Sequence, residues 1–267
     1  MTRWLTRFGY DGRSFAGWAR QPGLRTIEGE LLAGLSRSSR RNPSENLGLE
    51  VASRTDRGVS AVGNALALRS DLPGSVLLRQ LNGIEPAIFF SAATPIADNF
   101  RVRGATRRTY RYFRPVASAD VPAWKRAATL FRGSIDVRSF GRAIPSNEPC
   151  RRSIERLTVR QVPGGLCIEV RAPSFVWGMV RKIVGALGEH AAGRLPLGRL
   201  EAALHGEKRL SLPLAGPEGL VLWKVEYPIP WTTYWGGPNR HQTEFVQRNR
   251  ESMWTQARVH QMLFSAR

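Results

Sequence analysis

The residue best suited to chemistry is Asp56, a single acid between Arg54 and Arg57 in the stretch Ala-Ser-Arg-Thr-Asp-Arg-Gly-Val-Ser-Ala at residues 52–61. This stretch is a short polar break between two apolar runs. A carboxylate beside guanidinium groups stays ionised at neutral pH because the ion pair favours its charged form, and arginines also hold phosphates. The pattern indicates a carboxylate presented to an anionic substrate. The alternative is a solvated turn acid, which is common beside a glycine.

A second candidate segment mixes arginines with tyrosines. It contains Arg101, Arg103, Arg107, Arg108, Tyr110, Arg111 and Tyr112. In an extended strand Arg108, Tyr110 and Tyr112 share one face. Aromatic rings among arginines are typical of surfaces that bind single-stranded RNA, where rings stack on bases and guanidinium groups hold phosphates. A solvated edge strand is the alternative interpretation.

A third segment, residues 174–185, predicts the start of an apolar helix that carries two cations, Arg181 and Lys182. Met179 and Ile183 belong to its core-facing stripe. Arg181 is therefore either a flanking residue that extends to solvent or a cation held near a site, and the helix alone does not decide. The turn from Tyr10 to Trp18, with Asp11-Gly12 at its centre, either packs as a plain loop or positions substrate.

The charge of the chain indicates a polyanionic partner. Among 267 residues, 40 Lys and Arg stand against 21 Asp and Glu, which gives a net charge of +19. Most of the cations are arginines, which suit nucleic acid. No apolar run long enough to span a membrane and no apolar signal core are present, so we expect a cytoplasmic protein. Two cysteines, Cys150 and Cys167, and four scattered histidines predict neither a disulfide framework nor a metal site.

Periodicity predicts the same element order, β-α-β-β-α-β, in two halves. The first half has strands near 3–10, 47–52, 63–70 and 87–93, with helices from Thr26 and near 75–82; the second has strands near 107–116, 153–161, 165–171 and 218–227, with helices near 120–131, 176–190 and 198–205. We expect an α+β fold in which two ferredoxin-like (split βαβ) halves, residues 1–100 and 101–227, form one extended antiparallel sheet with a central basic cleft. Residues 228–267 form an appended tail. Prolines and glycines should break any regular element at residues 228–238, and the polar segment that follows either docks on the core or contacts RNA.

In their order along the chain, these motifs resemble the TruA family of tRNA pseudouridine synthases. The matching residues are Tyr10, Asp11, Gly12, Phe15, Gly17 and Trp18; Arg54, Thr55, Asp56, Gly58, Val59 and Ala61; Leu81, Asn82, Phe100, Arg103, Ala105, Arg108, Tyr110, Arg111 and Tyr112; Ser174, Phe175, Val176, Met179, Val180, Arg181, Ile183, Val184 and Gly185; and Ala215, Pro217, Gly219 and Leu220. Three residues depart from the family pattern. Ser53 replaces glycine, Arg57 replaces alanine and Ser60 replaces histidine, while the tail has no assigned counterpart.

The resemblance implies an isomerase that converts uridine to pseudouridine in tRNA, in the anticodon arm around tRNA positions 38–40. It implies Asp56 as the catalytic residue, as nucleophile or as base, Tyr110 stacking on the flipped base, and Arg181 pairing with Asp56. We expect the RNA-binding residues to be Arg54, Thr55, Arg57, Arg103, Arg108 and Lys182. It also implies a homodimer, tRNA as partner, and no metal or small-molecule cofactor.

Two other functions remain open from the residues. A tRNA-binding protein of the same ancestry that has lost catalysis would fit the three departures around Asp56. A general RNA-binding or ribosome-associated module would fit two ferredoxin-like halves with a basic face. Such a module, however, has no need for one acid held between arginines in a loop.

Overall fold

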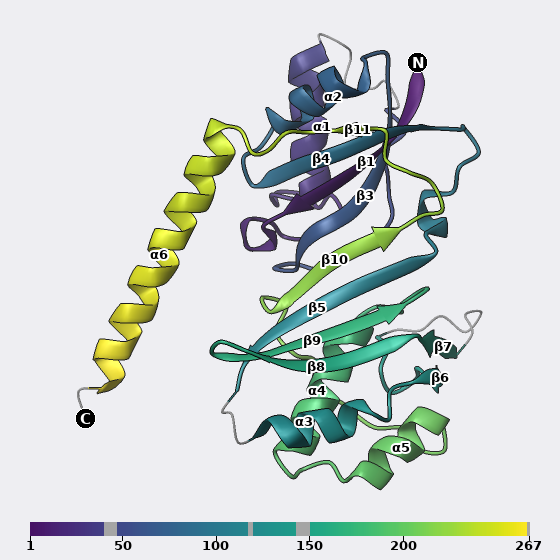
Figure 1. Ribbon diagram of the computed structural model, residues 1–267, viewed down its shortest axis with the longest axis vertical. Coiled ribbons are helices and arrows are strands. Elements are labelled where there is room, and N and C mark those ends of the chain that lie inside the picture. The colour runs from purple at the N-terminus through teal and green to yellow at the C-terminus, as the bar shows by residue number, and fades with distance from the viewer. Residues whose placement is uncertain (40–46, 117–119, 143–149, 266–267) are drawn as a thin grey trace.

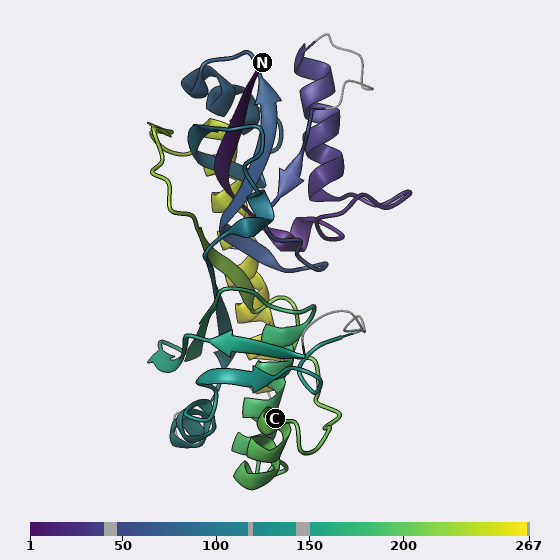
Figure 2. The same ribbon diagram turned by 90° about the vertical axis from the view of Figure 1, so that its right-hand side faces the viewer.

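One sheet runs along the molecule and joins its two halves. The computed structural model describes residues 1–39, 47–116, 120–142 and 150–265. Nine strands form the main sheet in the order β11-β4-β1-β3-β10-β5-β9-β8, and β2 pairs with β3 beside this path. Figures 1 and 2 show α1 and α2 at one end of the long axis, and α3, α4 and α5 at the other.

The first half has the predicted element order. It consists of β1 (Thr2–Tyr10), α1 (Ile27–Ser39), β2 (Glu50–Val51), β3 (Ser60–Ser70), α2 (Gly74–Asn82) and β4 (Ile88–Ile96). Its strand order, β4-β1-β3-β2, is that of a split βαβ unit, with antiparallel pairing throughout. The two helices form because Ile27, Leu31 and Leu35 on one, and Leu77, Leu78 and Leu81 on the other, recur at helical spacing and are all buried in the same core.

The second half repeats this order with an insertion. It consists of β5 (Arg107–Pro115), α3 (Val121–Ala128), β6 (Gly133–Asp136), β7 (Arg151–Ile154), β8 (Arg156–Val162), β9 (Gly165–Ala172), α4 (Met179–Ala191), α5 (Leu197–His205) and β10 (Leu220–Glu226). Its strand order, β10-β5-β9-β8, again matches the prediction. The separate two-stranded sheet of β6 and β7 was not predicted, since four-residue strands give too little alternation to detect.

The halves meet through a short parallel pair. Val221 and Leu222 of β10 lie opposite Ser60 and Ala61 of β3. The expected extended sheet is therefore confirmed. It is antiparallel except at the junction of the halves, the seam, where β3 and β10 run in the same direction. Ser60 begins β3 directly after the Asp56 loop, so the seam and that loop are adjacent.

Each half has its own hydrophobic core. Fully buried side chains include Phe8 and Phe90 in the first half, and Phe131 and Phe140 in the second. Tyr110 on β5 is only partly buried and packs against both cores. It therefore lies on the seam, where a cleft between the halves would expose it.

The tail after Tyr227 contains two regular elements that were not predicted. Residues after Tyr227 first add β11 (Thr233–Tyr234) to the sheet beside β4, and then form α6 (Arg240–Ser265), a helix of 26 residues that leaves the body of the molecule (Figure 1). Gln242 anchors its start, because its buried amide donates to Asn82 Oδ1 at 2.9 Å and to the Ile88 carbonyl at 3.0 Å.

The helix escaped prediction because it lacks a clear apolar stripe. Polar and charged residues lie around it, and side-chain pairs four residues apart support it, such as Arg240 with Glu244 and Gln247 with Glu251.

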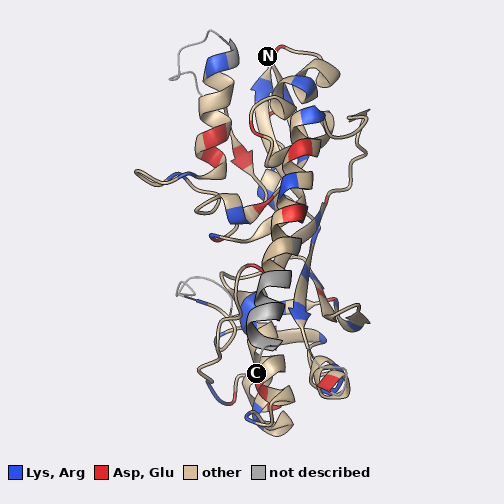
Figure 3. Ribbon diagram, turned by 90° about the vertical axis from the view of Figure 1, so that its left-hand side faces the viewer, with Lys and Arg blue, Asp and Glu red and all other residues tan. Residues whose placement is uncertain are grey.

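None of the helices in the described ranges is long and apolar enough to cross a membrane. Lys and Arg are distributed along both halves and on α6 (Figure 3).

Candidate active site

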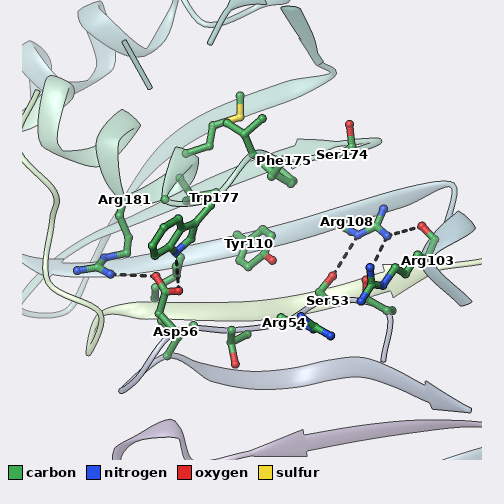
Figure 4. A pocket seen from close by; sticks show the side chains of 18 residues that line it. Ser53, Arg54, Asp56, Arg103, Arg108, Tyr110, Ser174, Phe175, Trp177 and Arg181 are labelled. Atoms are coloured by element: carbon green, nitrogen blue, oxygen red, sulfur yellow. Dashed lines mark hydrogen bonds and ion pairs between the residues drawn. The ribbon is translucent and has the colours of Figure 1, made fainter. Parts of the chain in front are cut away.

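The carboxylate of Asp56 is held by two donors that come from the other half of the molecule. Arg181, in the first turns of α4, donates from Nη1 to Oδ2 at 3.1 Å, and the indole of Trp177 donates from Nε1 to Oδ1 at 2.8 Å (Figure 4). The Asp56 side chain keeps 30% of its surface exposed. Arg181 is thus a cation held at the site, and not a solvated flank of its helix.

Asp56 opens onto a cavity of about 710 Å³ between the halves. Seven of the nine predicted site residues line it: Arg54, Thr55, Asp56, Arg103, Arg108, Tyr110 and Arg181. Apolar side chains from the loop before α4, including Phe175 and Val176, complete the wall. A cavity of this size with a few polar groups at fixed places is typical of a site for a small group such as a nucleoside.

Tyr110 presents a neutral phenol to this cavity. Burial raises its pKa, with the charge of Asp56 adding to the effect, while the charge of Arg108 and a hydrogen bond with Ser53 oppose it. Its ring contacts Phe175 edge to face, with centroids 5.1 Å apart. The phenol can therefore stack or donate a hydrogen bond, and it does not carry a negative charge beside Asp56.

Arg108 has no free donor for RNA. Its Nε donates to Ser53 Oγ at 3.1 Å, and its two terminal nitrogens donate to the carbonyls of Ala105, Pro173, Ala52 and Arg103. All five N–H groups of the guanidinium are thereby used. This buried side chain ties together three segments that border the cavity, which is a different task from the phosphate contact predicted for it.

Arg181 is positioned by the segment before β10. Its Nε donates to the Ala215 carbonyl at 2.6 Å, and the Ala215 amide donates back to the Arg181 carbonyl at 3.2 Å. Gly185, one helical turn later, packs so tightly that a Cβ there would lie 2.1 Å from the Pro213 carbonyl oxygen. The third and last sequence motifs therefore act together, and they aim Arg181 at the carboxylate.

The segment from Tyr10 to Trp18 packs against the Asp56 loop and supports it. The Trp18 amide donates to the Thr55 carbonyl at 3.1 Å, and the hydroxyls of Tyr10 and Thr55 are 2.8 Å apart. Gly17 has φ of 111° and lies against the backbone of residues 55–57, where a side chain would crowd the loop. This motif thus supports the loop. It also forms a hydrogen bond with the hydroxyl of Thr55, a residue that was predicted to bind RNA.

Two of the three departures from the family pattern have structural partners. Ser53 Oγ accepts a hydrogen bond from Arg108, and Ser60 Oγ accepts one from the Gly12 amide at 3.0 Å. Arg57 differs, since its exposed side chain forms no hydrogen bond or ion pair with any residue in the described ranges. It does not line the first cavity, and it lines a second one.

Lys182 lies outside both cavities. Its Nζ donates to the carbonyls of Ser139 at 3.3 Å and Gly141 at 3.0 Å, and so holds the loop that precedes Arg142. Burial and the nearby charge of Arg142 lower the pKa of Lys182. Its predicted contact with RNA stays a prediction, while its visible contacts are with the protein.

Trp177 and Arg142 are site residues that the sequence did not reveal. Trp177 stands inside a recognised motif, and a tryptophan next to an apolar helix start is typical of a core residue, yet 53% of its surface is exposed. Arg142 carries no signal in the sequence, because its position depends on a loop that returns to the site. Over the part of the chain that the structure describes, no three His, Cys, Asp or Glu side chains gather as metal ligands do.

Known proteins similar in sequence to this chain include several named tRNA pseudouridine synthase A. A family whose model is described as tRNA pseudouridine synthase matches residues 127–228. The protein named tRNA pseudouridine synthase A of Thermococcus kodakarensis is 39% identical over 83% of this chain and 84% of its own length, and that of Thermococcus onnurineus is 38% identical over 84% and 85%. A solved structure titled a Cbf5-Nop10-Gar1 complex matches 67% of this chain and 44% of its own at 14% identity, with a TM-score of 0.33.

The similarity extends into the tail. The protein of the same name from Thermococcus sibiricus is 33% identical over 97% of this chain and 98% of its own length. An alignment of that extent must include most residues after Tyr227. The tail, for which the sequence motifs offered no counterpart, is therefore shared with at least one relative.

Proposed function

Because this chain belongs to the tRNA pseudouridine synthase A (TruA) family of isomerases, we propose that Asp56 catalyses the conversion of uridine to pseudouridine in the anticodon arm of tRNA. The observation that carries the proposal is the Asp56 carboxylate at the mouth of the cavity between the halves, with Arg181 and Trp177 on its two oxygens. Such a fixed carboxylate beside a nucleoside-sized cavity is what this isomerisation requires.

The reaction is an internal transfer that needs no redox step. The bond between ribose C1′ and uracil N1 breaks, a bond from C1′ to C5 forms, and the proton on C5 is finally replaced by one on N1. A carboxylate serves this chemistry as a nucleophile at C1′ or as a base on the ribose. Asp56 suits either role, because Arg181 and Trp177 leave lone pairs on both carboxylate oxygens free.

The target base must leave the RNA stack before it can react. Flipping costs a few kcal/mol, which contacts with phosphates and with the base offset. Arg54 is exposed at the mouth of the cavity and suits this task, and the exposed Arg103 lines the same cavity. Tyr110 would stack on the flipped uracil and take part in the proton transfer at C5 as a neutral phenol.

The wider assignment follows from kinship and from charge. The net charge of +19 suits tRNA as the partner. We expect a cytoplasmic homodimer in which one tRNA contacts both subunits, with no metal or small-molecule cofactor. A gel filtration measurement with light scattering, made with and without tRNA, tests the dimer separately from the activity.

The function is tested on a tRNA transcript that carries no modification. After incubation with the purified protein, pseudouridines are mapped by carbodiimide labelling and primer extension. The proposal predicts new pseudouridine in the anticodon arm, around positions 38–40, and none with heat-inactivated protein. Pseudouridine confined to another arm would overturn the positional assignment, and none anywhere would overturn the function.

A further inference from the structure

A second cavity adjoins the first across the side chain of Trp177. It has a volume of about 650 Å³. Arg54, Thr55, Asp56, Trp177 and Arg181 line both cavities and so form their common wall. Arg57 and Arg142 line only the second cavity, whereas Arg103, Arg108 and Tyr110 line only the first.

Trp177, in the common wall, is in direct contact with Arg142 of the second cavity. The Arg142 amide donates to the Trp177 carbonyl at 2.8 Å, and the Arg142 guanidinium carbon lies 4.3 Å from the centre of the indole ring. A guanidinium over an indole is a favourable cation–π contact. Lys182 donates hydrogen bonds to the carbonyls of Ser139 and Gly141, just before Arg142. The position of Arg142 is therefore set by several contacts.

The second cavity is lined by four arginines and a single acid. Arg54, Arg57, Arg142 and Arg181 face a single carboxylate, that of Asp56, which is paired with Arg181. Within the described ranges, Arg57 and Arg142 form no ion pair, although arginines elsewhere do, such as Arg107 with Glu155 and Arg111 with Glu169. Exposed cations that outnumber the acids in a concave site attract a phosphate.

We propose that this second cavity binds the phosphodiester of a nucleotide next to the target uridine, with Arg57 and Arg142 as its ligands. The inference rests on the proposed function, which places the uridine in the first cavity. RNA is favoured over free phosphate because a strand with one nucleotide inserted beside Asp56 must continue past the shared wall. The proposal also gives a role to Arg57, which directly follows Asp56 and lines only the second cavity.

The salt dependence of tRNA binding measures how many phosphates the protein holds. For single-stranded RNA, removing one contact between a protein cation and a phosphate reduces the slope of log affinity against log salt by about 0.7. Arg57→Ala and Arg142→Gln should each reduce it by about that amount, and the double variant by about twice as much. Arg194→Gln is the matched control, because Arg194 is an exposed, ion-paired arginine beyond the end of α4 and outside both cavities.

A neutral methylphosphonate in place of one phosphate locates the bound phosphodiester. The RNA carries this group immediately 5′ or 3′ of the mapped target uridine. At one of these two positions the methylphosphonate should weaken RNA binding by the wild-type protein several-fold. At the same position it should not change RNA binding by the double variant, because that protein no longer holds the phosphate. Inorganic phosphate at constant ionic strength should compete less with RNA for the double variant than for the wild type.

Two results would overturn the proposal. One is a salt slope in the double variant equal to that of wild type, and the other is a methylphosphonate cost that is the same in both proteins at both places. If the wild-type protein is active and the salt slopes of the variants equal that of wild type, only this inference is refuted. If the slopes change but the wild-type protein has no isomerase activity, only the proposed function is refuted.

Discussion

At the scale of single residues, the site is defined by how the oxygens of Asp56 are held. Each oxygen has its own donor, and both donors belong to the other half of the molecule. The resemblance to the TruA family singled out Asp56, Tyr110 and Arg181, and the structure brings all three to one cavity. Trp177 could not be predicted in the same way, since an indole that donates to a carboxylate looks in sequence like one that is buried.

Arg181→Lys tests whether the geometry of this residue matters beyond its charge. Lysine keeps the positive charge but lacks the planar fork that reaches both the Ala215 carbonyl and Asp56. Turnover should fall by about 100-fold, the cost of misplacing a reacting group by about 1 Å, while KM for tRNA changes by no more than a few fold. Single-turnover kinetics measure both, and a variant as fast as wild type would contradict this role.

At the scale of elements, the site depends on close packing between segments that are far apart in the chain. The most demanding is the approach of α4 to the segment before β10 at Gly185, where no Cβ would fit. The helix itself was predictable from its apolar stripe. The approach was not, because periodicity shows which residues face a core and not which loop covers them.

Gly185→Ala should therefore destabilise the protein even though alanine favours a helix. The new Cβ would lie 2.1 Å from the Pro213 carbonyl oxygen, and overpacking of this kind costs about 1–3 kcal/mol. Urea denaturation measures the loss, and activity should fall with it because the Ala215 carbonyl shifts away from Arg181. The matched control is Gly198→Ala in α5, where nothing lies within 4 Å and the change should be neutral or stabilising by up to about 1 kcal/mol.

At the scale of the whole molecule, two similar halves each supply what the other lacks. The first half carries the acid, and the second carries its two donors and the tyrosine strand. The duplicated order of elements was predictable, because each half has its own alternation and helical stripes. The parallel junction and α6 were not, since the first depends on how two finished sheets meet and the second lacks a clear apolar stripe.

The packing of the whole molecule also predicts how its stability depends on pH. Burial raises the pKa of Tyr10 above its ordinary value of 10.0, and burial does the same for Tyr227. Below pH 10 both residues are neutral in the folded and unfolded chains, so their stability contribution is complete. Above pH 10 the unfolded chain loses these protons first, and the free energy of unfolding should fall by up to about 1.4 kcal/mol per pH unit for each residue.

Tyr10→Phe isolates one of these contributions. The variant loses the hydrogen bond with Thr55 at every pH, which costs about 1 kcal/mol, but it should show a shallower decline between pH 10 and 11 than wild type. Urea denaturation at pH 8, 10 and 11 measures both effects. Equal declines in the two proteins would mean that Tyr10 is not kept neutral by its burial.

The catalytic role of Asp56 is tested most sharply by the substitution Asp56→Asn, which keeps the shape of the side chain and removes its charge. The measurement is tritium release from tRNA that carries 5-tritiated uridine, with tRNA affinity measured on the same preparation. We predict no release above background and an affinity within about twofold of wild type, because Asp56 acts on the reacting nucleoside and holds no phosphate. Tritium release at the wild-type rate would show that the carboxylate is not the catalytic group.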